Sequence, residues 1–187
     1  MLKKNLHLIL FHLLIITLSN FLVQYPMVFF SYTTTWGMFS FPFLVLASDL
    51  TVRLRGKKVA RYIIYISYIP CLIISMALNS YRVAIASASA YFVGQILDIF
   101  IFSSIRKKNK SWWTAPVIST TTSNVLDTYL FFAVAFYQCS DPFMKKNWLQ
   151  IAHVDLIFKI FISIIFFLPI YAFVLNYILK KYSSDYS

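Results

Sequence analysis

Gly94-Gln95-Ile96-Leu97-Asp98 and Ser119-Thr120-Thr121-Thr122-Ser123-Asn124-Val125-Leu126-Asp127 are two polar patches, each inside an apolar run long enough to cross a bilayer. Only a short basic loop, residues 106–110, separates the two runs. A carboxylate near the middle of a bilayer costs about 2.5–3.5 kcal/mol on insertion scales, so such groups sit in bundle interiors or cavities. We therefore expect the two patches to face each other and to hold a polar solute.

The composition is that of a membrane protein. Of the 187 residues, 60% are hydrophobic and 12% are charged, whereas soluble domains have about 45–50% apolar and about 25% charged residues. The apolar runs continue for about twenty residues, which predicts helices rather than the alternating strands of a β-barrel. We expect an all-α membrane protein in which residues 1–187 form a single six-transmembrane-helix bundle.

Six hydrophobic segments define this bundle, at residues 6–30, 38–52, 62–78, 83–105, 113–137 and 149–179. The second is short for a full span and is expected to lean on the preceding turn, residues 31–37. The last is long and contains Pro169, which predicts a tilt or a kink.

The positive charges predict the orientation of the six spans. With a cytoplasmic N-terminus, 13 of the 17 Lys and Arg residues fall on the cytoplasmic side, three fall on the other side, and Lys159 lies within the last segment. Cytoplasmic loops are rich in Lys and Arg, so both termini are predicted to be cytoplasmic. The net charge of +11 then reports membrane topology and lipid contact, and no nucleic-acid partner is expected.

The polar patch of the fourth segment lies on a face of small residues. Ala86, Ala90, Gly94 and Asp98 are spaced by four, so they share one helical face, and Gln95 precedes Asp98 by three. Small residues let another helix approach closely. The fourth segment is therefore predicted to present Gln95 and Asp98 to a tightly packed neighbour.

The polar patch of the fifth segment has the same spacing. Ser119, Ser123 and Asp127 share a face, and Asn124 precedes Asp127 by three. At 1.5 Å per residue, Asn124 and Gln95 each lie about 16 Å from the basic loop. The two carboxamides are therefore expected at a similar depth near the midplane.

Interhelical hydrogen bonding is the alternative role for these polar residues, at about 0.6 kcal/mol per bond. It suffices for the Ser and Thr residues of the fifth segment, and it remains open for Gln95 and Asn124. For Asp98 and Asp127 we favour a ligand, because a carboxylate only accepts hydrogen bonds and suits a molecule that donates several.

Four further polar or aromatic residues have two possible roles each. Asp155 and Lys159, one turn apart, predict an ion pair, which we prefer to a proton-relay role. Asp49 either pairs with Arg53, one turn later, or belongs to the site. Trp36 belongs to an interfacial aromatic belt or covers a cavity mouth and stacks on a planar ligand.

The sequence gives no support to catalysis, a metal or a cofactor. Cys71 and Cys139 are in no metal-like spacing, and His7 and His12 do not share a helical face. With three Gly residues in the whole chain, a Gly-rich phosphate loop is excluded. We expect neither an enzyme nor an ATPase.

Several motifs resemble those of the queuosine precursor transporters, the YhhQ family. They span nearly the whole chain in order and are Thr34-Thr35-Trp36-Gly37, Phe39-Ser40-Phe41-Pro42-Phe43, Ser48-Asp49-Leu50-Thr51-Val52-Arg53, Gly94-Gln95-Ile96-Leu97-Asp98, Trp112-Trp113-x-Ala115-Pro116, Ser123-Asn124-x-x-Asp127-Thr128 and Phe166-Phe167-Leu168-Pro169-x-Tyr171. The resemblance implies a multi-pass protein of the bacterial inner (cytoplasmic) membrane. It implies import of 7-cyano-7-deazaguanine and 7-aminomethyl-7-deazaguanine, from which the tRNA nucleoside queuosine is made.

The residues of the motifs carry over only as candidates for substrate contact. These are Gln95, Asp98, Asn124, Asp127, Trp36 and Asp49. A deazaguanine has N–H donors along its guanine-like edge, and one carboxylate can accept two of them. A carboxamide can hydrogen-bond the carbonyl group of the deazaguanine, and an aromatic ring can stack on the deazaguanine ring.

The resemblance also leaves an alternative function. Similar small six-helix bundles are the substrate-binding membrane subunits of multi-component vitamin or nucleobase importers, energised by a separate module. The sequence leaves open the energy source, the preferred precursor, an energising partner and assembly into a homo-oligomer.

Overall fold

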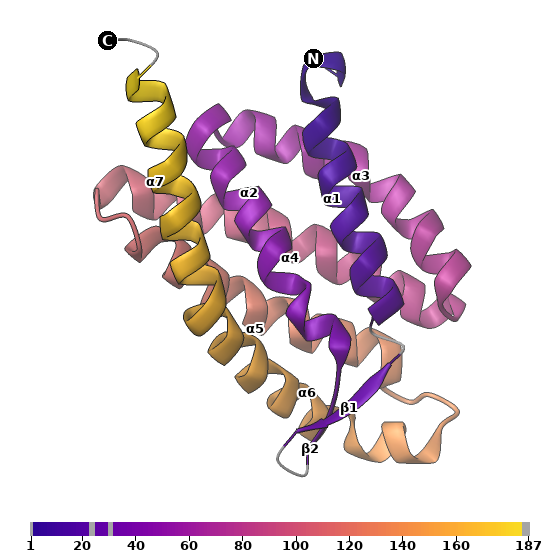
Figure 1. Cartoon of the computed structure of the whole chain (residues 1–187). Helices are drawn as coiled ribbons and strands as arrows, with labels where there is room; N and C mark the ends of the chain where they lie inside the picture. Colours follow the sequence, from indigo (N-terminus) through magenta and orange to yellow (C-terminus); the bar gives the residue numbers. More distant parts are fainter. Residues whose placement is uncertain (1, 23–24, 30–31, 185–187) are drawn as a thin grey trace.

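The computed structural model describes residues 2–22, 25–29 and 32–184, which form a bundle of long helices (Figure 1). The helices are α1 (Leu2–Leu22), α2 (Phe41–Arg55), α3 (Lys57–Leu78), α4 (Tyr81–Lys108), α5 (Thr114–Phe136), α6 (Pro142–Ile162) and α7 (Leu168–Ser184). A π-helical turn, η2 (Ser163–Phe167), joins α6 to α7 without a loop. The described part of the chain therefore contains six helical rods.

Five of the rods are long and apolar enough to cross a membrane, and α5 is the remaining one. The polar patch of α5, Ser119 to Asp127, makes it less apolar than the others. This helix packs between α4 and α6, and those polar side chains that are buried face protein rather than lipid. The predicted all-α membrane fold is confirmed.

The first predicted segment, residues 6–30, ends earlier than expected. Helix α1 stops at Leu22, and β1 (Pro26–Phe29) pairs with β2 (Tyr32–Thr35) in an antiparallel hairpin. Pro26 cannot continue a helix, and β-branched residues in both strands favour the extended conformation. A 3₁₀ turn, η1 (Trp36–Phe39), then leads into α2.

Pro169, where the sequence predicts a tilt or a kink, directly follows the π-helical turn and Leu168. The N–H of Leu168 donates to the carbonyl of Ser163, five residues back. Proline lacks an N–H and crowds the carbonyl four residues before it, and a π-turn is one way in which a helix absorbs this.

Helix α4 is the central element, packed between α3 and α5. Its small side chains are buried on the sides that meet these neighbours, at Ala84, Ala86, Ala88 and Ala90. On the α5 side, a Cβ placed on Gly94 would lie 3.2 Å from the Cβ of Asp127. The small-residue face thus brings the two polar patches together, as the spacing predicted.

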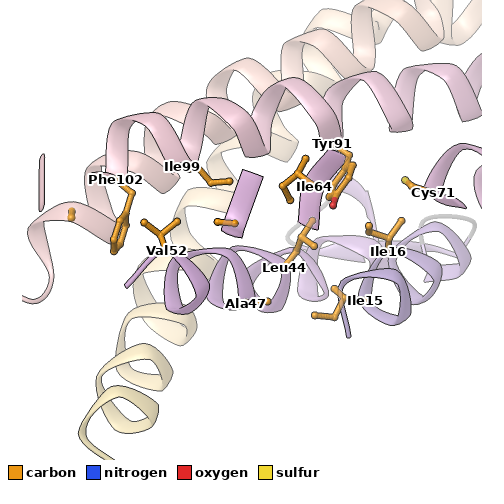
Figure 2. Close-up of a cluster of buried hydrophobic side chains, with 12 residues drawn as sticks. Ile15, Ile16, Leu44, Ala47, Val52, Ile64, Cys71, Tyr91, Ile99 and Phe102 are labelled. Atoms are coloured by element: carbon orange, nitrogen blue, oxygen red, sulfur yellow. The ribbon is translucent and has the colours of Figure 1, made fainter. Parts of the chain in front are cut away.

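A hydrophobic cluster holds α4 against the first three helices (Figure 2). It includes Ile15 and Ile16 of α1, Leu44 and Val52 of α2, and Ile64 of α3. Figure 2 shows them converging on side chains of α4. This packing fixes the position of α2 relative to α4, which is important for the acidic residues that the two helices carry.

One end of the bundle carries both the start of α1 and the end of α7. Figure 1 shows the start of α1, the end of α7 and the α2–α3 turn at the upper end, and the hairpin at the opposite end. At the hairpin end, Arg82 donates from Nε to the carbonyl of Val134 at 2.8 Å and also hydrogen-bonds the carbonyl of Tyr137. Arg82 therefore satisfies carbonyls at the end of α5.

Gly94→Ala tests the close approach of α4 to α5. The new methyl group forces the helices apart at Asp127, and overpacking of this kind costs about 1–3 kcal/mol. We expect a lower midpoint of thermal unfolding of the purified protein in detergent.

Thr122→Ala is the control, because Thr122 lies on the exposed face of α5, where a substitution changes stability by less than about 0.5 kcal/mol. Equal midpoints for Gly94→Ala and Thr122→Ala would contradict the close packing.

Candidate functional site

A cavity of about 700 Å³ lies among α1, α4, α5 and α6. Its lining begins near the α3–α4 turn, at Asn79 and Val83, and reaches inward to Gln95, Asp127 and Lys159. Cavities that hold drug-sized ligands have volumes of about 300–1,000 Å³ and are mainly apolar with a few polar groups. The cavity therefore runs from the hairpin end to the middle of the bundle and suits a small ligand.

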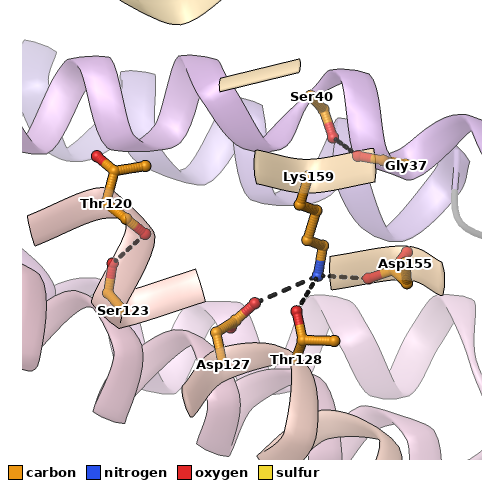
Figure 3. Close-up of polar contacts among 8 residues, drawn as sticks. All are labelled: Gly37, Ser40, Thr120, Ser123, Asp127, Thr128, Asp155 and Lys159. Atoms are coloured by element: carbon orange, nitrogen blue, oxygen red, sulfur yellow. Dashed lines mark hydrogen bonds and ion pairs between the residues drawn. The ribbon is translucent and has the colours of Figure 1, made fainter. Parts of the chain in front are cut away.

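Lys159 is the centre of a polar network at the inner part of this cavity (Figure 3). Its Nζ lies 3.0 Å from Oδ2 of Asp155 and 3.4 Å from Oδ2 of Asp127, and it donates to Oγ1 of Thr128 at 3.2 Å. We call these four residues the lysine network. One ammonium serves two carboxylates, so a negative charge remains uncompensated when all three groups are ionised.

The predicted ion pair of Asp155 with Lys159 is confirmed, but it is only half of the arrangement. The contact of Lys159 with Asp127 joins α6 to α5 and was missed, because a local partner one turn away already accounted for the lysine. A lysine inside an apolar run is itself the signal that could have placed it in the site.

Gln95 and Asp127, two of the predicted site residues, both line the cavity. Gln95 comes from α4, is buried, and has no hydrogen-bond partner for Oε1. Ser123 lines the cavity from α5 and donates to Oδ1 of Asp98 at 3.4 Å. The two polar patches thus meet at one cavity and leave an acceptor available to a ligand.

Asn124 and Trp36 are not among the described residues that line this cavity. Asn124 is fully buried between helices, with neither side-chain amide atom hydrogen-bonded. Trp36 is 49% exposed and its ring packs 5.7 Å from that of Phe39. The neighbours of Trp36, Gly37 and Met38, do line the cavity, so Trp36 lies beside the site rather than in it.

Asp49 and Asp98 also lie outside the cavity lining, and they contact each other instead. Both are 0% exposed, and each carboxyl group is within hydrogen-bonding reach of the other. We call them the acid pair. Because Ser123 donates to Asp98 and lines the cavity, the acid pair is one hydrogen bond away from the cavity.

Of the two alternatives for Asp49, an ion pair with Arg53 is not what the structure shows. Among the described residues, no ion pair within 4.0 Å joins them. Arg53 instead donates from Nη1 to the hydroxyl of Tyr171 at 3.0 Å, with its guanidinium 5.9 Å from the centre of that ring. Asp49 is directed toward α4, whereas Arg53 reaches α7, so residues one turn apart serve different neighbours.

Asn20 is a further site residue that the sequence reasoning passed over. Its Nδ2 donates to Oγ of Ser75 at 2.8 Å, and its Oδ1 accepts from Oγ of Ser87 at 3.0 Å. Asn20 and Ser87 line the cavity and link α1 to α3 and α4. An asparagine inside the first apolar run was the available signal.

Metal ligands do not gather in the part of the chain that the structure describes. No group of three or more His, Cys, Asp or Glu side chains there could hold a metal ion.

Comparisons with known proteins match most of the chain. Residues 75–174 match the family model described as "Putative vitamin uptake transporter". The "Queuosine precursor transporter" of Escherichia coli (strain K12) is 46% identical over 192 residues, which cover 92% of this chain and 86% of that protein. The "Probable queuosine precursor transporter" of Haemophilus influenzae is 42% identical over 203 residues, covering 91% and 86%.

The family match includes both polar patches and the lysine network, and it starts after the acid pair's Asp49. A shorter match, to the "Probable queuosine precursor transporter" of Bacillus subtilis (strain 168), is 32% identical over 87 residues and covers 45% of this chain. No solved structure matches the chain.

Lys159→Ala tests the lysine network. Removing one member of a buried ion pair leaves the others uncompensated and costs about 3–5 kcal/mol. We expect a marked fall in the thermal unfolding midpoint in detergent, and recovery in Asp127→Asn/Asp155→Asn/Lys159→Met, which removes all three charges together.

The control is Lys145→Ala on the same helix, where the lysine is exposed. A midpoint for Lys159→Ala equal to that of Lys145→Ala would show that the network contributes nothing to stability.

Proposed function

Because the chain belongs to the family of queuosine precursor transporters, we propose that it imports 7-cyano-7-deazaguanine and 7-aminomethyl-7-deazaguanine for tRNA queuosine modification. The observation that carries this proposal is the 46% identity to a curated transporter over 86% of that protein's length. The chain is a transporter rather than an enzyme. The cavity supports the proposal because its volume and its few polar groups fit a small planar heterocycle.

The substrate edge that resembles guanine fits the groups at the inner part of the cavity. Its ring N–H and exocyclic amino group can donate to the carboxylate of Asp127. Gln95 can accept from a remaining donor through its free Oε1 and can donate to the substrate carbonyl. We assign Asp127 and Gln95 as substrate contacts, with Lys159 as the partner that Asp127 exchanges for substrate.

The apolar part of the cavity fits the flat ring. Phe131 and Phe132 of α5 and Tyr91 of α4 line it, and aromatic side chains stack on heterocyclic bases at about 1–3 kcal/mol each. The aminomethyl precursor also carries an ammonium group. The uncompensated negative charge of the lysine network favours this cation. The nitrile group at the same position of the cyano precursor is uncharged and can only accept a hydrogen bond.

We further propose that the protein crosses the cytoplasmic membrane of bacteria six times, with both termini in the cytoplasm. The support is that the α2–α3 turn lies at the same end of the bundle as the start of α1 and the end of α7 (Figure 1). The sequence around this turn is rich in Lys and Arg. Cytoplasmic loops are enriched in Lys and Arg. In this orientation the cavity extends from the external side to the middle of the bundle, ready to receive substrate from outside.

Asp127→Asn tests the substrate contact. Loss of a charged acceptor weakens its hydrogen bonds by about 1.5–3 kcal/mol, which corresponds to about a tenfold or larger loss of affinity. We expect uptake of radiolabelled 7-cyano-7-deazaguanine by liposomes that contain only the purified protein to fall accordingly. In cells that depend on supplied precursor, tRNA should lose queuosine.

The matched control is Asp141→Asn, at an exposed residue that caps α6 through Met144; asparagine caps helices equally well. Wild-type uptake by Asp127→Asn and by Gln95→Ala would remove both residues from the site. Uptake that requires a second protein would favour the alternative of a binding subunit with a separate energising module.

The two cysteines test the orientation. Cys139 lies at the hairpin end and is partly exposed, while Cys71 is buried. We expect a membrane-impermeant thiol reagent, added to intact cells without an outer membrane, to label the wild type at Cys139 and to leave Cys139→Ser unlabelled. Labelling of Cys139 only after the cells are lysed would reverse the proposed topology.

A further inference from the structure

The acid pair is a site whose role the substrate cavity does not explain. Asp49 of α2 and Asp98 of α4 are 0% exposed. Neither oxygen of Asp49, nor Oδ2 of Asp98, has a hydrogen-bond donor among the described residues. An ionised carboxylate only accepts hydrogen bonds, so two carboxyl groups can bond each other only when a proton lies between them. The geometry therefore calls for a bound proton.

The charged and titratable groups around the acid pair do not replace that proton. From α2, Arg53 attracts Asp49 electrostatically, but its hydrogen bond goes to the hydroxyl of Tyr171 on α7. From α4, Arg106 interacts electrostatically with Tyr171, and its guanidinium donates a hydrogen bond to the carbonyl of Asn109 in the α4–α5 loop. From α5, the neutral hydroxyl groups of Ser119 and Ser123 face Asp98. Within the described chain, no Lys or Arg nitrogen lies within 4.0 Å of either carboxyl group.

Ser123 connects the acid pair to the cavity. Its hydroxyl lines the cavity and donates to Oδ1 of Asp98 at 3.4 Å. Asp98 lies one turn of α4 beyond Gly94, about 6 Å farther along the axis toward the basic loop. The acid pair is thus placed between the cavity and the end of the bundle that carries the start of α1 and the end of α7. A substrate that takes the hydroxyl of Ser123 removes a donor from Asp98, which makes the proton harder to release.

We propose that Asp49 and Asp98 form a proton-binding site that couples substrate import to a proton gradient across the membrane. This inference rests on the proposed transport function. The proton enters from the external side and is held between the two carboxyl groups while substrate occupies the cavity. With proton and substrate both bound, the bundle opens toward either side, which is the movement that counterflow measures. When the proton leaves toward the cytoplasm, the two ionised carboxylates repel each other and α2 shifts against α4. The affinity of the cavity for the substrate then falls, and the substrate leaves.

The experiment uses the purified full chain in liposomes with radiolabelled 7-cyano-7-deazaguanine and two assays. Counterflow, the exchange of labelled for unlabelled substrate without an ion gradient, measures binding and movement. Net accumulation under an inside-alkaline gradient measures coupling, and an internal pH dye records proton entry. One proton per substrate and a gradient of about one pH unit sustain about tenfold accumulation in the wild type.

Asp49→Asn is the diagnostic variant. Its side-chain amide donates to Asp98 and imitates the protonated pair permanently, so we expect counterflow to continue while accumulation and substrate-dependent proton entry are lost. Asp98→Asn should behave alike, and it carries the test if Asp49→Asn fails to fold. Asp141→Asn, at an exposed acid, should keep all three signals.

The outcomes separate the coupling from the transport function. Counterflow by the wild type without gradient-driven accumulation or proton entry overturns the coupling and leaves transport standing. Absence of counterflow in the wild type overturns the proposed function and the coupling with it. Accumulation driven by a sodium gradient alone assigns Na⁺ to the pair and overturns the proton. Loss of counterflow in a well-folded Asp49→Asn places the pair in the substrate site and also overturns the inference.

Discussion

A carboxylate inside a bilayer must find its partner within the protein, and this constraint shapes the centre of the bundle. Two solutions are present on neighbouring helices. Asp127 shares the ammonium of Lys159 with Asp155, whereas Asp98 meets a second carboxyl group, that of Asp49. The first solution holds a charge within reach of a ligand, and the second is the one to which we assign a bound proton. Their chemistry differs although Asp98 and Asp127 are surrounded by similar polar patches in the sequence.

The packing of small residues allows this polar arrangement to form inside an apolar bilayer. Gly94 lets α5 approach until the Cβ of Asp127 would touch a methyl group at that position, and the alanines of α4 extend the contact. Because α4 and α6 shelter α5, α5 can carry a polar patch that an isolated membrane helix would expose to lipid. Close approach of backbones is therefore what allows a polar site at this depth.

The sequence predicted those features that depend on local periodicity. The spacing by four along α4 and α5, and the distance of each polar patch from the basic loop, predicted that the two patches face each other. Gln95 and Asp127 do line one cavity. Partners far apart in the chain were not predictable in this way. Lys159 already had Asp155 one turn away, and Asp49 had Arg53, so each appeared locally satisfied. The structure gives Lys159 a second partner on α5 and directs Asp49 to α4. The hairpin was missed because its first strand is as apolar as the helix before it, although Pro26 marked the boundary.

The position of the acid pair relative to the cavity has a mechanical consequence. The hydrophobic cluster joins α2 to α4 around Val52, Ile99 and Phe102, and the contact of Arg53 with Tyr171 joins α2 to α7 at the same end. In the coupling that we propose, loss of the proton changes the attraction between the carboxyl groups of α2 and α4 into repulsion and shifts α2 at that end. Like charges in contact in a medium of low dielectric constant repel strongly. The helix that shifts is thus the one that carries half of the proposed proton site, so a single element links proton release to substrate release.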